Sequence, residues 1–173
     1  MKRLVHWVDS VLSWTVVILM VVIVLDVTWQ VFTRFVMRNP SSFTEELATF
    51  LLIWLGLLGG AYALRLNAHL GIDVLTIRLS PERRYMWEFV IYTFVIIFSV
   101  LVLLWGGLRL VNITLYLNQI SAALRIKMGY VYTVLPITGV LLVFYSIHFM
   151  ITAAQGLKNH RFELMNQEKV GID

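Results

Sequence analysis

The sequence predicts an all-α membrane protein with four transmembrane helices. Of its 173 residues, 60% are hydrophobic and only 14% are charged, and the mean hydropathy is +0.82. A soluble domain carries about 25% charged residues. Four apolar runs are each long enough for a helix to cross a hydrocarbon core of about 30 Å. We predict spans at about 11–34, 45–65, 86–109 and 130–154, and a single membrane domain over residues 1–173.

The first apolar run begins like a secretory signal peptide, because Lys2 and Arg3 precede it. The run continues to Leu25, however, and no small-residue cleavage site follows, so we interpret it as a retained membrane helix. Trp7 and Trp29 bracket it, separated by about 33 Å at helical rise. That separation fits the two aromatic belts of a membrane protein.

An ionisable residue, Asp26, lies inside this first span and shares a helical stripe with Gln30 and Arg34. A charge near the bilayer centre costs about 2.5–3.5 kcal/mol on insertion scales, so Asp26 needs a partner, a proton or a polar cavity. One interpretation is an ion-coupling carboxylate. We favour structural polar packing, because coupling sites gather several polar groups and broken helices. The sequence shows neither an internal repeat nor an interrupted helix.

The second span opens with two adjacent acids, Glu45 and Glu46, which suit the positive end of a helix dipole. Ser42 stands three residues before Glu45, and this spacing predicts a capping box. A short first connection would bring Glu46 to the same boundary as Arg34. The sequence therefore also predicts an ion pair between Arg34 and Glu46, contributing about 0–1 kcal/mol.

Small residues recur through the second span in two pairs spaced by four, Gly56 with Gly60 and Gly59 with Ala63. Each pair lies on one helix face, where another helix backbone can approach closely. The partner helix belongs either to this chain or to a second subunit, and the pattern does not decide. Trp54 lies near the middle of the membrane, where an interfacial belt does not explain it.

The remaining connections are short or apolar. Arg65 closes the second apolar run and His69 follows it, in a connection that reads either as a short interfacial helix or as an extended segment. The apolar pattern from Arg109 to Gly129 predicts that the third helix overruns the membrane or that a helix lies on its surface. Pro136 falls in the first turns of the last span, where proline is tolerated.

Basic residues predict the orientation. Nine of the 14 Lys and Arg residues lie in the N-terminus, the second connection and the C-terminus. The positive-inside rule therefore places both termini in the cytoplasm.

The sequence lacks the motifs of several function classes. The chain has no cysteine, which excludes disulfides and thiolate metal sites. It has no glycine-rich phosphate loop, and no paired carboxylates or catalytic triad stand out for hydrolysis. One histidine, His148, lies within a predicted span, where a haem anchor would need two. We expect no enzyme activity, no metal or other cofactor, and no nucleic-acid partner. A stand-alone four-helix exchanger that uses Asp26 remains the alternative function.

Two groups of residues resemble a known family, the small membrane subunit of tripartite ATP-independent periplasmic (TRAP) transporters. The first group is Arg34–Asn39, Phe43–Ala48, Trp54, Gly59, Ala61, Arg65 and His69, and the second is Gly129, Tyr130, Tyr132, Leu135–Ile137 and Gly139. The resemblance covers nearly the whole chain. It departs from the family at Phe43, where tryptophan is usual.

The resemblance implies a bacterial inner-membrane protein that pairs with a large membrane subunit. The large subunit would carry the sodium and substrate sites, and a soluble periplasmic protein would deliver an organic acid such as sialic acid or a C4-dicarboxylate. The small subunit would be a fixed scaffold in the lipid bilayer that helps to dock the periplasmic protein, with Arg125 and Lys127 as candidate docking residues. We assign a structural or subunit-interface role to Asp26, Gln30, Arg34, Glu45, Glu46, Trp54, Gly56, Gly59, Gly60, Arg65, His69 and Pro136.

The charge bias gives a direct test of topology. We expect Asn39 and Asn118 to lie on the outer side of the membrane and Arg83 and Gln167 to lie on the cytoplasmic side. Single cysteines at these positions can be labelled in intact cells with an impermeant thiol reagent. Labelling of Asn39→Cys and Asn118→Cys alone is the expected result, whereas labelling of Arg83→Cys without Asn39→Cys would reverse the orientation.

Overall fold

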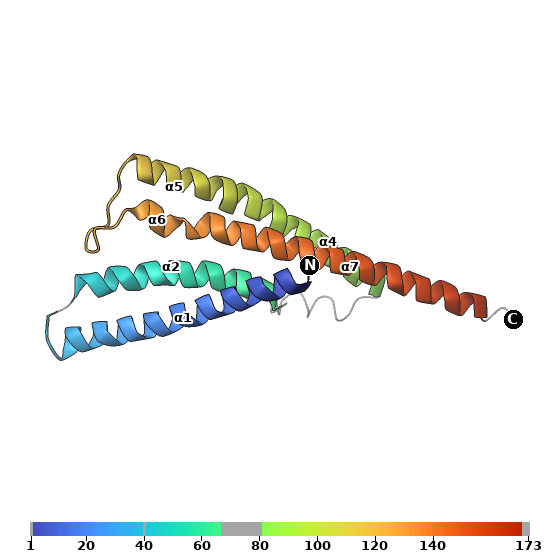
Figure 1. The fold of residues 1–173 in the computed structure, drawn as a ribbon, viewed down its shortest axis with the longest axis horizontal. Coiled ribbons are helices and arrows are strands. Elements are labelled where there is room, and N and C mark those ends of the chain that lie inside the picture. The colour runs from blue at the N-terminus through green and yellow to red at the C-terminus, as the bar shows by residue number, and fades with distance from the viewer. Residues whose placement is uncertain (1, 40, 67–80, 171–173) are drawn as a thin grey trace.

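The computed structural model describes the backbone of residues 2–39, 41–66 and 81–170. Its helical elements are α1 (Lys2–Phe35), α2 (Ser42–Arg65), α4 (Pro81–Phe98), the π-helical η1 (Ser99–Gly106), α5 (Gly107–Tyr116), α6 (Met128–Tyr132) and α7 (Val134–Val170) (Figure 1). Four helical runs are long and apolar enough to cross a membrane: Val5–Phe35, Ser42–Arg65, Trp87–Tyr116 and Met128–Gln155. These four helices confirm the predicted fold class. The predicted interfacial segment after Arg65 and its His69 lie outside the described residues.

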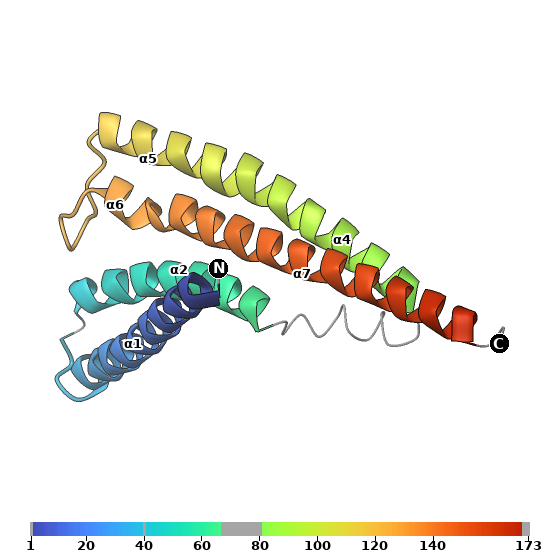
Figure 2. The same cartoon turned by 45° about the vertical axis from the view of Figure 1, so that its right-hand side comes forward.

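The elements form two helical hairpins. In one, α1 packs against α2; in the other, α4, η1 and α5 run along α6 and α7. Figures 1 and 2 show the hairpins side by side with α2 next to α7, and α2 and α7 contact each other. Helix α7 extends past the other helices toward the C-terminus (Figure 1). The seam between α2 and α7 therefore joins the two halves of the molecule.

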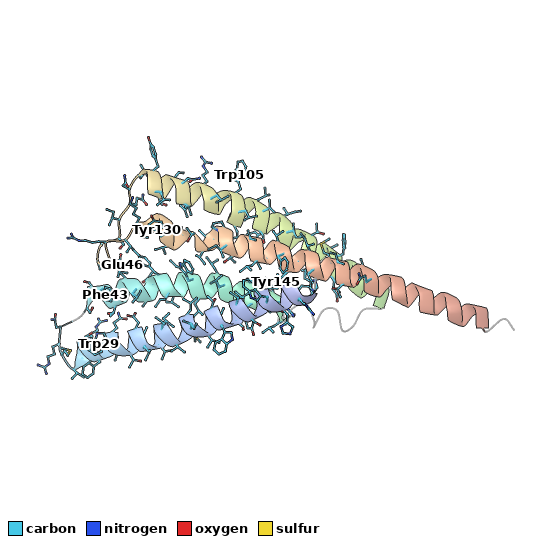
Figure 3. The ribbon with its side chains drawn as sticks, viewed as in Figure 1. Trp29, Phe43, Glu46, Trp105, Tyr130 and Tyr145 are labelled. Atoms are coloured by element: carbon cyan, nitrogen blue, oxygen red, sulfur yellow. The ribbon has the colours of Figure 1, made fainter. Side chains whose placement is uncertain are left out.

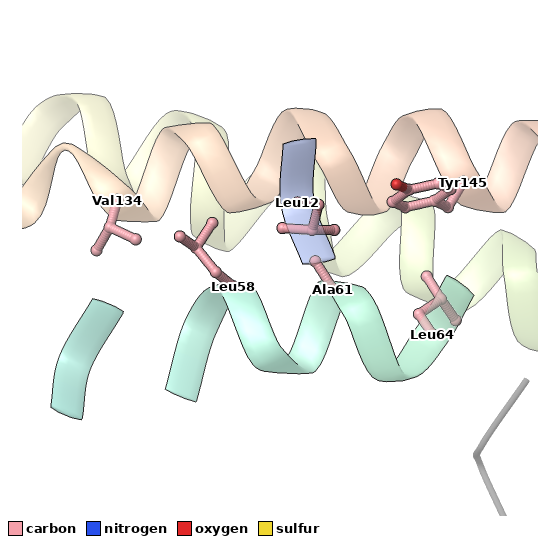
Figure 4. Packing of buried hydrophobic residues seen from close by; sticks show 6 residues of the cluster. All are labelled: Leu12, Leu58, Ala61, Leu64, Val134 and Tyr145. Atoms are coloured by element: carbon pink, nitrogen blue, oxygen red, sulfur yellow. The ribbon is translucent and has the colours of Figure 1, made fainter. Parts of the chain in front are cut away.

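A small apolar cluster fills this seam and its junction with α1. Its buried members are Leu12 from α1, Leu58, Ala61 and Leu64 from α2, and Val134 and Tyr145 from α7 (Figure 4). Ala61, Val134 and Tyr145 are fully buried. Many other large apolar side chains stay exposed on α1, α4 and η1, as expected for surfaces that meet lipid or other membrane helices.

The start of α2 differs from the predicted capping box. Ser41, not Ser42, is the N-cap residue, and its side chain makes no capping hydrogen bond. The capping-box prediction is therefore wrong, because the helix begins one residue earlier than that motif requires. The hydroxyl of Thr44 instead donates to the carbonyl oxygen of Ser41 at 2.9 Å, a local bond typical of threonine.

The third span continues well beyond Arg109. Helical structure extends without a break from α4 through η1 and α5 to Tyr116, so the overrunning helix is the correct alternative for the first part of the third connection. The wide π-helical turns of η1 pack against α7. Such turns are rare in helices and are retained where they serve packing or function.

The last span, Met128–Gln155, is interrupted only locally, at Thr133, whose backbone keeps helical dihedral angles (φ −60°, ψ −22°). Helix α6 ends at Tyr132 and α7 begins at Val134. Pro136 lies in the first turn of α7 and has no N–H, so it gives no bond to the carbonyl four residues earlier, that of Tyr132. The prediction that Pro136 falls in the first turns of the last span, where proline is tolerated, is confirmed.

Glycines divide into two groups by what surrounds them. A Cβ added at Gly56, Gly59 or Gly60 would meet no heavy atom of the described residues within 4 Å. The close approach between helices occurs at three other glycines, namely Gly107, Gly129 and Gly139. At Gly139 an added Cβ would lie 3.0 Å from Leu103 Cβ, and at Gly107 it would lie 2.9 Å from Leu135 Cβ.

The open glycines therefore do not hold this chain together. Gly56 and Gly60 are exposed, whereas Ala61, about 140° from Gly56 and about 100° from Gly60 around α2, is fully buried in the seam. The sequence left open whether the partner helix of the glycine pairs belongs to this chain or to a second subunit. No helix in the described part of this chain approaches Gly56, Gly59 or Gly60 closely.

Candidate functional site

Glu46, in the first turns of α2, binds a loop from the other hairpin. Its Oε1 accepts the backbone N–H of Ala122 at 3.1 Å, and its Oε2 accepts those of Ala123 and Leu124 at 2.8 and 2.7 Å. Figure 3 shows Glu46 pointing from α2 toward this loop. Three consecutive N–H groups that converge on one anion form a typical backbone anion site. The carboxylate thus joins the two hairpins at the end of the molecule where α2 begins.

We call residues 117–127, between α5 and α6, the 117–127 loop. It is a tight reversal in which Ile120 and Lys127 form an isolated antiparallel bridge. The Ser121 N–H donates to the Ile126 carbonyl at 2.9 Å, and the Ile126 N–H donates to the Ser121 hydroxyl at 3.3 Å. Two residues of the loop, Asn118 and Arg125, have left-handed backbones with φ of 47° and 53°.

This contact replaces the predicted Arg34–Glu46 ion pair. Arg34 is exposed near the end of α1, and the carboxylate of Glu46 is occupied by the three loop amides. The structure places a salt bridge elsewhere, between Arg65 and Asp9. The ion-pair prediction is wrong, because opposite charge at one boundary carries no information about backbone donors elsewhere in the chain.

Trp54, in the middle of α2, binds the interrupted last span. Its indole N–H donates to the backbone carbonyl of Val131 at 3.0 Å, and Val131 itself is buried. Val131 lies in α6 next to the break before α7, where the regular pattern of helix bonds stops. A tryptophan at this depth is therefore explained by a polar bond across the seam.

Arg65, at the end of α2, completes a third polar contact. Its Nε donates to Asp9 Oδ2 at 2.7 Å, and its Nη2 lies 2.7 Å from the same oxygen. The Tyr145 hydroxyl donates to Asp9 Oδ1 at 2.9 Å. One carboxylate therefore connects α1, α2 and α7. Figure 3 shows the position of Tyr145 on α7.

Sequence reasoning missed Asp9 and Tyr145. Asp9 precedes the predicted first span and looks like an ordinary charge near a chain end. One signal was available, since Asp9 and Arg65 both lie at the predicted cytoplasmic ends of adjacent spans, where opposite charges would meet.

Asp26 is buried on α1, with 9% of its surface exposed. Its Oδ2 atom has no hydrogen-bond partner among the described residues. Gln30 is half-buried and Arg34 is exposed, and neither side chain donates a hydrogen bond to this oxygen. No group of three or more His, Cys, Asp or Glu side chains in the described part of the chain is placed to hold a metal ion.

The other candidate residues lie near the start of α2 or on the loop. Glu45 is exposed, in contrast to its neighbour Glu46. Arg125 and Lys127 are both exposed on the 117–127 loop. Arg38 is exposed in the connection between α1 and α2, at the same end of the molecule as the loop (Figure 1).

The amino-acid sequence matches the model of a known family. The family model for the DctQ component of tripartite ATP-independent periplasmic transporters matches residues 23–156. The chain belongs to this family. It is therefore a component of a transporter and a multi-pass protein of the bacterial inner membrane.

Individual relatives agree with this membership. The chain is 27% identical over 84 residues to the sialic acid TRAP transporter small permease protein SiaQ of Vibrio cholerae, covering 49% of this chain and 47% of the relative. It is 25% identical over 141 residues to a Haemophilus influenzae protein provisionally named as a TRAP transporter small permease, covering 82% and 86%. It is also 33% identical over 118 residues to the sialic acid TRAP transporter permease protein SiaT of Haemophilus influenzae, covering 66% of this chain but 18% of that longer protein.

The network around Asp9 generates a stability prediction. Tyr145→Phe keeps the buried ring and removes one hydrogen bond to a carboxylate, so we expect the free energy of unfolding to fall by about 1–2 kcal/mol, or several degrees in Tm. The measurement is thermal unfolding in detergent. Tyr130→Phe, at an exposed ring, is the matched control. Equal Tm values for the two variants would show that the hydroxyl of Tyr145 stabilises nothing.

Proposed function

We propose that this chain is the fixed small permease subunit of a sodium-driven TRAP transporter for an organic acid. The observation that carries the proposal is its membership of the DctQ family over residues 23–156. In this proposal the chain is not an enzyme and holds no cofactor. A large permease subunit carries the sodium and substrate sites, and a soluble periplasmic protein delivers the substrate.

Sialic acid is the first substrate to test, because two of the relatives are named as sialic acid transporter proteins. C4-dicarboxylates are the second class, as expected from the family resemblance. Residues that recognise the substrate lie in the other two components under this proposal, so this chain does not select between the two classes.

The scaffold role is supported by the open face of α2. Gly56 and Gly60 are exposed and leave room for a backbone, while another side of α2 is occupied by the seam. In the SiaT relative, the matched segment forms 18% of a longer permease protein, so a similar segment shares one chain with additional permease sequence. A helix of the large subunit is therefore the proposed occupant of the face formed by Gly56, Gly59 and Gly60.

The docking role is supported by charge. Arg125 and Lys127 on the 117–127 loop and Arg38 between α1 and α2 are all exposed at one end of the molecule. The positive-inside rule places this end in the periplasm. An exposed basic edge would attract an acidic surface on the periplasmic binding protein and speed its approach.

The scaffold proposal predicts that glycine substitutions separate assembly from folding. Gly60→Leu fills the open face, so we expect the chain to fold normally but to lose most of the large subunit in co-purification. Gly139→Leu is the matched control inside the chain, since its side chain would meet Leu103 and Leu104 and overpacking costs about 1–3 kcal/mol. Tm in detergent and subunit content are measured together. Undiminished large subunit with Gly60→Leu would place that subunit on another face.

The alternative function, a stand-alone exchanger that uses Asp26, is favoured by one observation, the unpaired Oδ2 of this buried carboxylate. The scaffold proposal predicts the opposite behaviour. Asp26→Asn should retain most uptake when the large subunit and the binding protein are present, because it removes only the cost of a charge at depth. The wild-type chain alone, in liposomes with a sodium gradient, should move no radiolabelled sialic acid or C4-dicarboxylate. Uptake by this chain alone that Asp26→Asn abolishes would favour the exchanger.

A further inference from the structure

We propose that Glu46 is a positioning residue for docking, which holds the 117–127 loop in the shape that the periplasmic binding protein recognises. The proposal rests on the docking role proposed above. It assigns to a side chain of α2, within the membrane domain, control over a surface that lies in a different hairpin.

The first step is the geometry of the loop. The N–H groups of Ala122, Ala123 and Leu124 all point at the carboxylate of Glu46, at 2.7–3.1 Å. A run of three neighbouring amides aimed at one point leaves little freedom for that part of the backbone. If the anion is removed, the three donors lose their partner and the backbone is free to turn away from α2.

The second step is the position of the basic residues. Arg125 follows Leu124 directly, and its left-handed φ of 53° is a conformation that non-glycine residues adopt only when their surroundings hold them there. The bond from the Leu124 N–H to Glu46 and the bond between Ser121 and Ile126 enclose Arg125 on both sides. The placement of the exposed Arg125 side chain therefore depends on Glu46 together with the Ser121–Ile126 bonds, and Lys127 is held in addition by its bridge to Ile120.

The third step separates positioning from general stability. The seam between the hairpins is also held by the Trp54–Val131 bond and by the network that joins Arg65, Asp9 and Tyr145. Both contacts lie further along α2 and do not involve the 117–127 loop. Loss of the Glu46 contact should therefore loosen the loop while the hairpins stay joined.

The chain offers a matched pair of variants. Glu46→Gln keeps the size of the side chain, but its NH2 group replaces one acceptor oxygen, so at least one loop amide loses its partner. Glu46→Ala removes both acceptors. Glu45→Gln makes the same change of charge one residue earlier, at an exposed side chain. Any effect of net charge near the start of α2 should appear in all three variants.

The experiment uses the complex of this chain with its large permease subunit in nanodiscs and the fluorescently labelled periplasmic binding protein. Amide hydrogen exchange over residues 121–126 reports the loop, and the binding isotherm reports docking. With Glu46→Gln we expect exchange at least tenfold faster in the loop and a Kd for the binding protein several-fold higher, with larger effects for Glu46→Ala. Glu45→Gln should stay within twofold of wild type in both measurements, and co-purification of the large subunit should be unchanged in all variants.

Each other outcome overturns the proposal in a recognisable way. Unchanged exchange with Glu46→Ala would show that the carboxylate does not hold the loop. Faster exchange with an unchanged Kd would show that the loop is held by Glu46 but does not dock the binding protein. Loss of the large subunit would assign Glu46 a role in assembly instead. If the wild-type complex binds no periplasmic protein while its loop exchange still depends on Glu46, the proposed docking function fails, and this inference fails with it.

Discussion

Polar bonds from α2 hold the two hairpins together across a seam that contains few buried apolar side chains. Within a bilayer, apolar packing gains little from the exclusion of water, and polar groups must find partners inside the protein. Helix α2 carries three such polar side chains with partners inside the protein: Glu46 at its start, Trp54 in its middle and Arg65 at its end. The bonds of Glu46 and Trp54 reach the other hairpin directly, whereas Arg65 binds Asp9 of α1, which in turn accepts the Tyr145 hydroxyl of α7.

These bonds divide the surface of α2 by function. One side carries Trp54 and the fully buried Ala61 and is committed to the seam with α7. Another side carries Gly56 and Gly60, which are exposed and unobstructed. A helix that is fixed on one side and open on the other suits a rigid support for another subunit. The same division explains why the close glycine contacts within the chain occur at Gly107, Gly129 and Gly139 instead.

The sequence predicted the four spans because hydropathy and length depend only on local composition. It could not predict the contacts of Glu46, since the three partners are backbone N–H groups, which every non-proline residue possesses. Close packing at the small-residue pairs stays a prediction, since spacing alone does not tell which side of a helix the chain itself covers. The bond from Trp54 to the carbonyl of Val131, near Pro136, could not be predicted locally either, because its donor comes from another helix.

The placement of the polar groups also bears on which chain performs transport. An ion pathway in a membrane protein combines an ionisable residue with a broken helix whose free carbonyls face it. Both ingredients exist in this chain, but they are not combined. Asp26 lies on α1, whereas the break lies between α6 and α7, and the carbonyl of Val131 beside it is bonded to the indole of Trp54. The tryptophan therefore occupies a carbonyl beside the irregular turn that would otherwise be free to face an ion. The buried carboxylate and the irregular turn thus do not form one polar site in the described part of the chain.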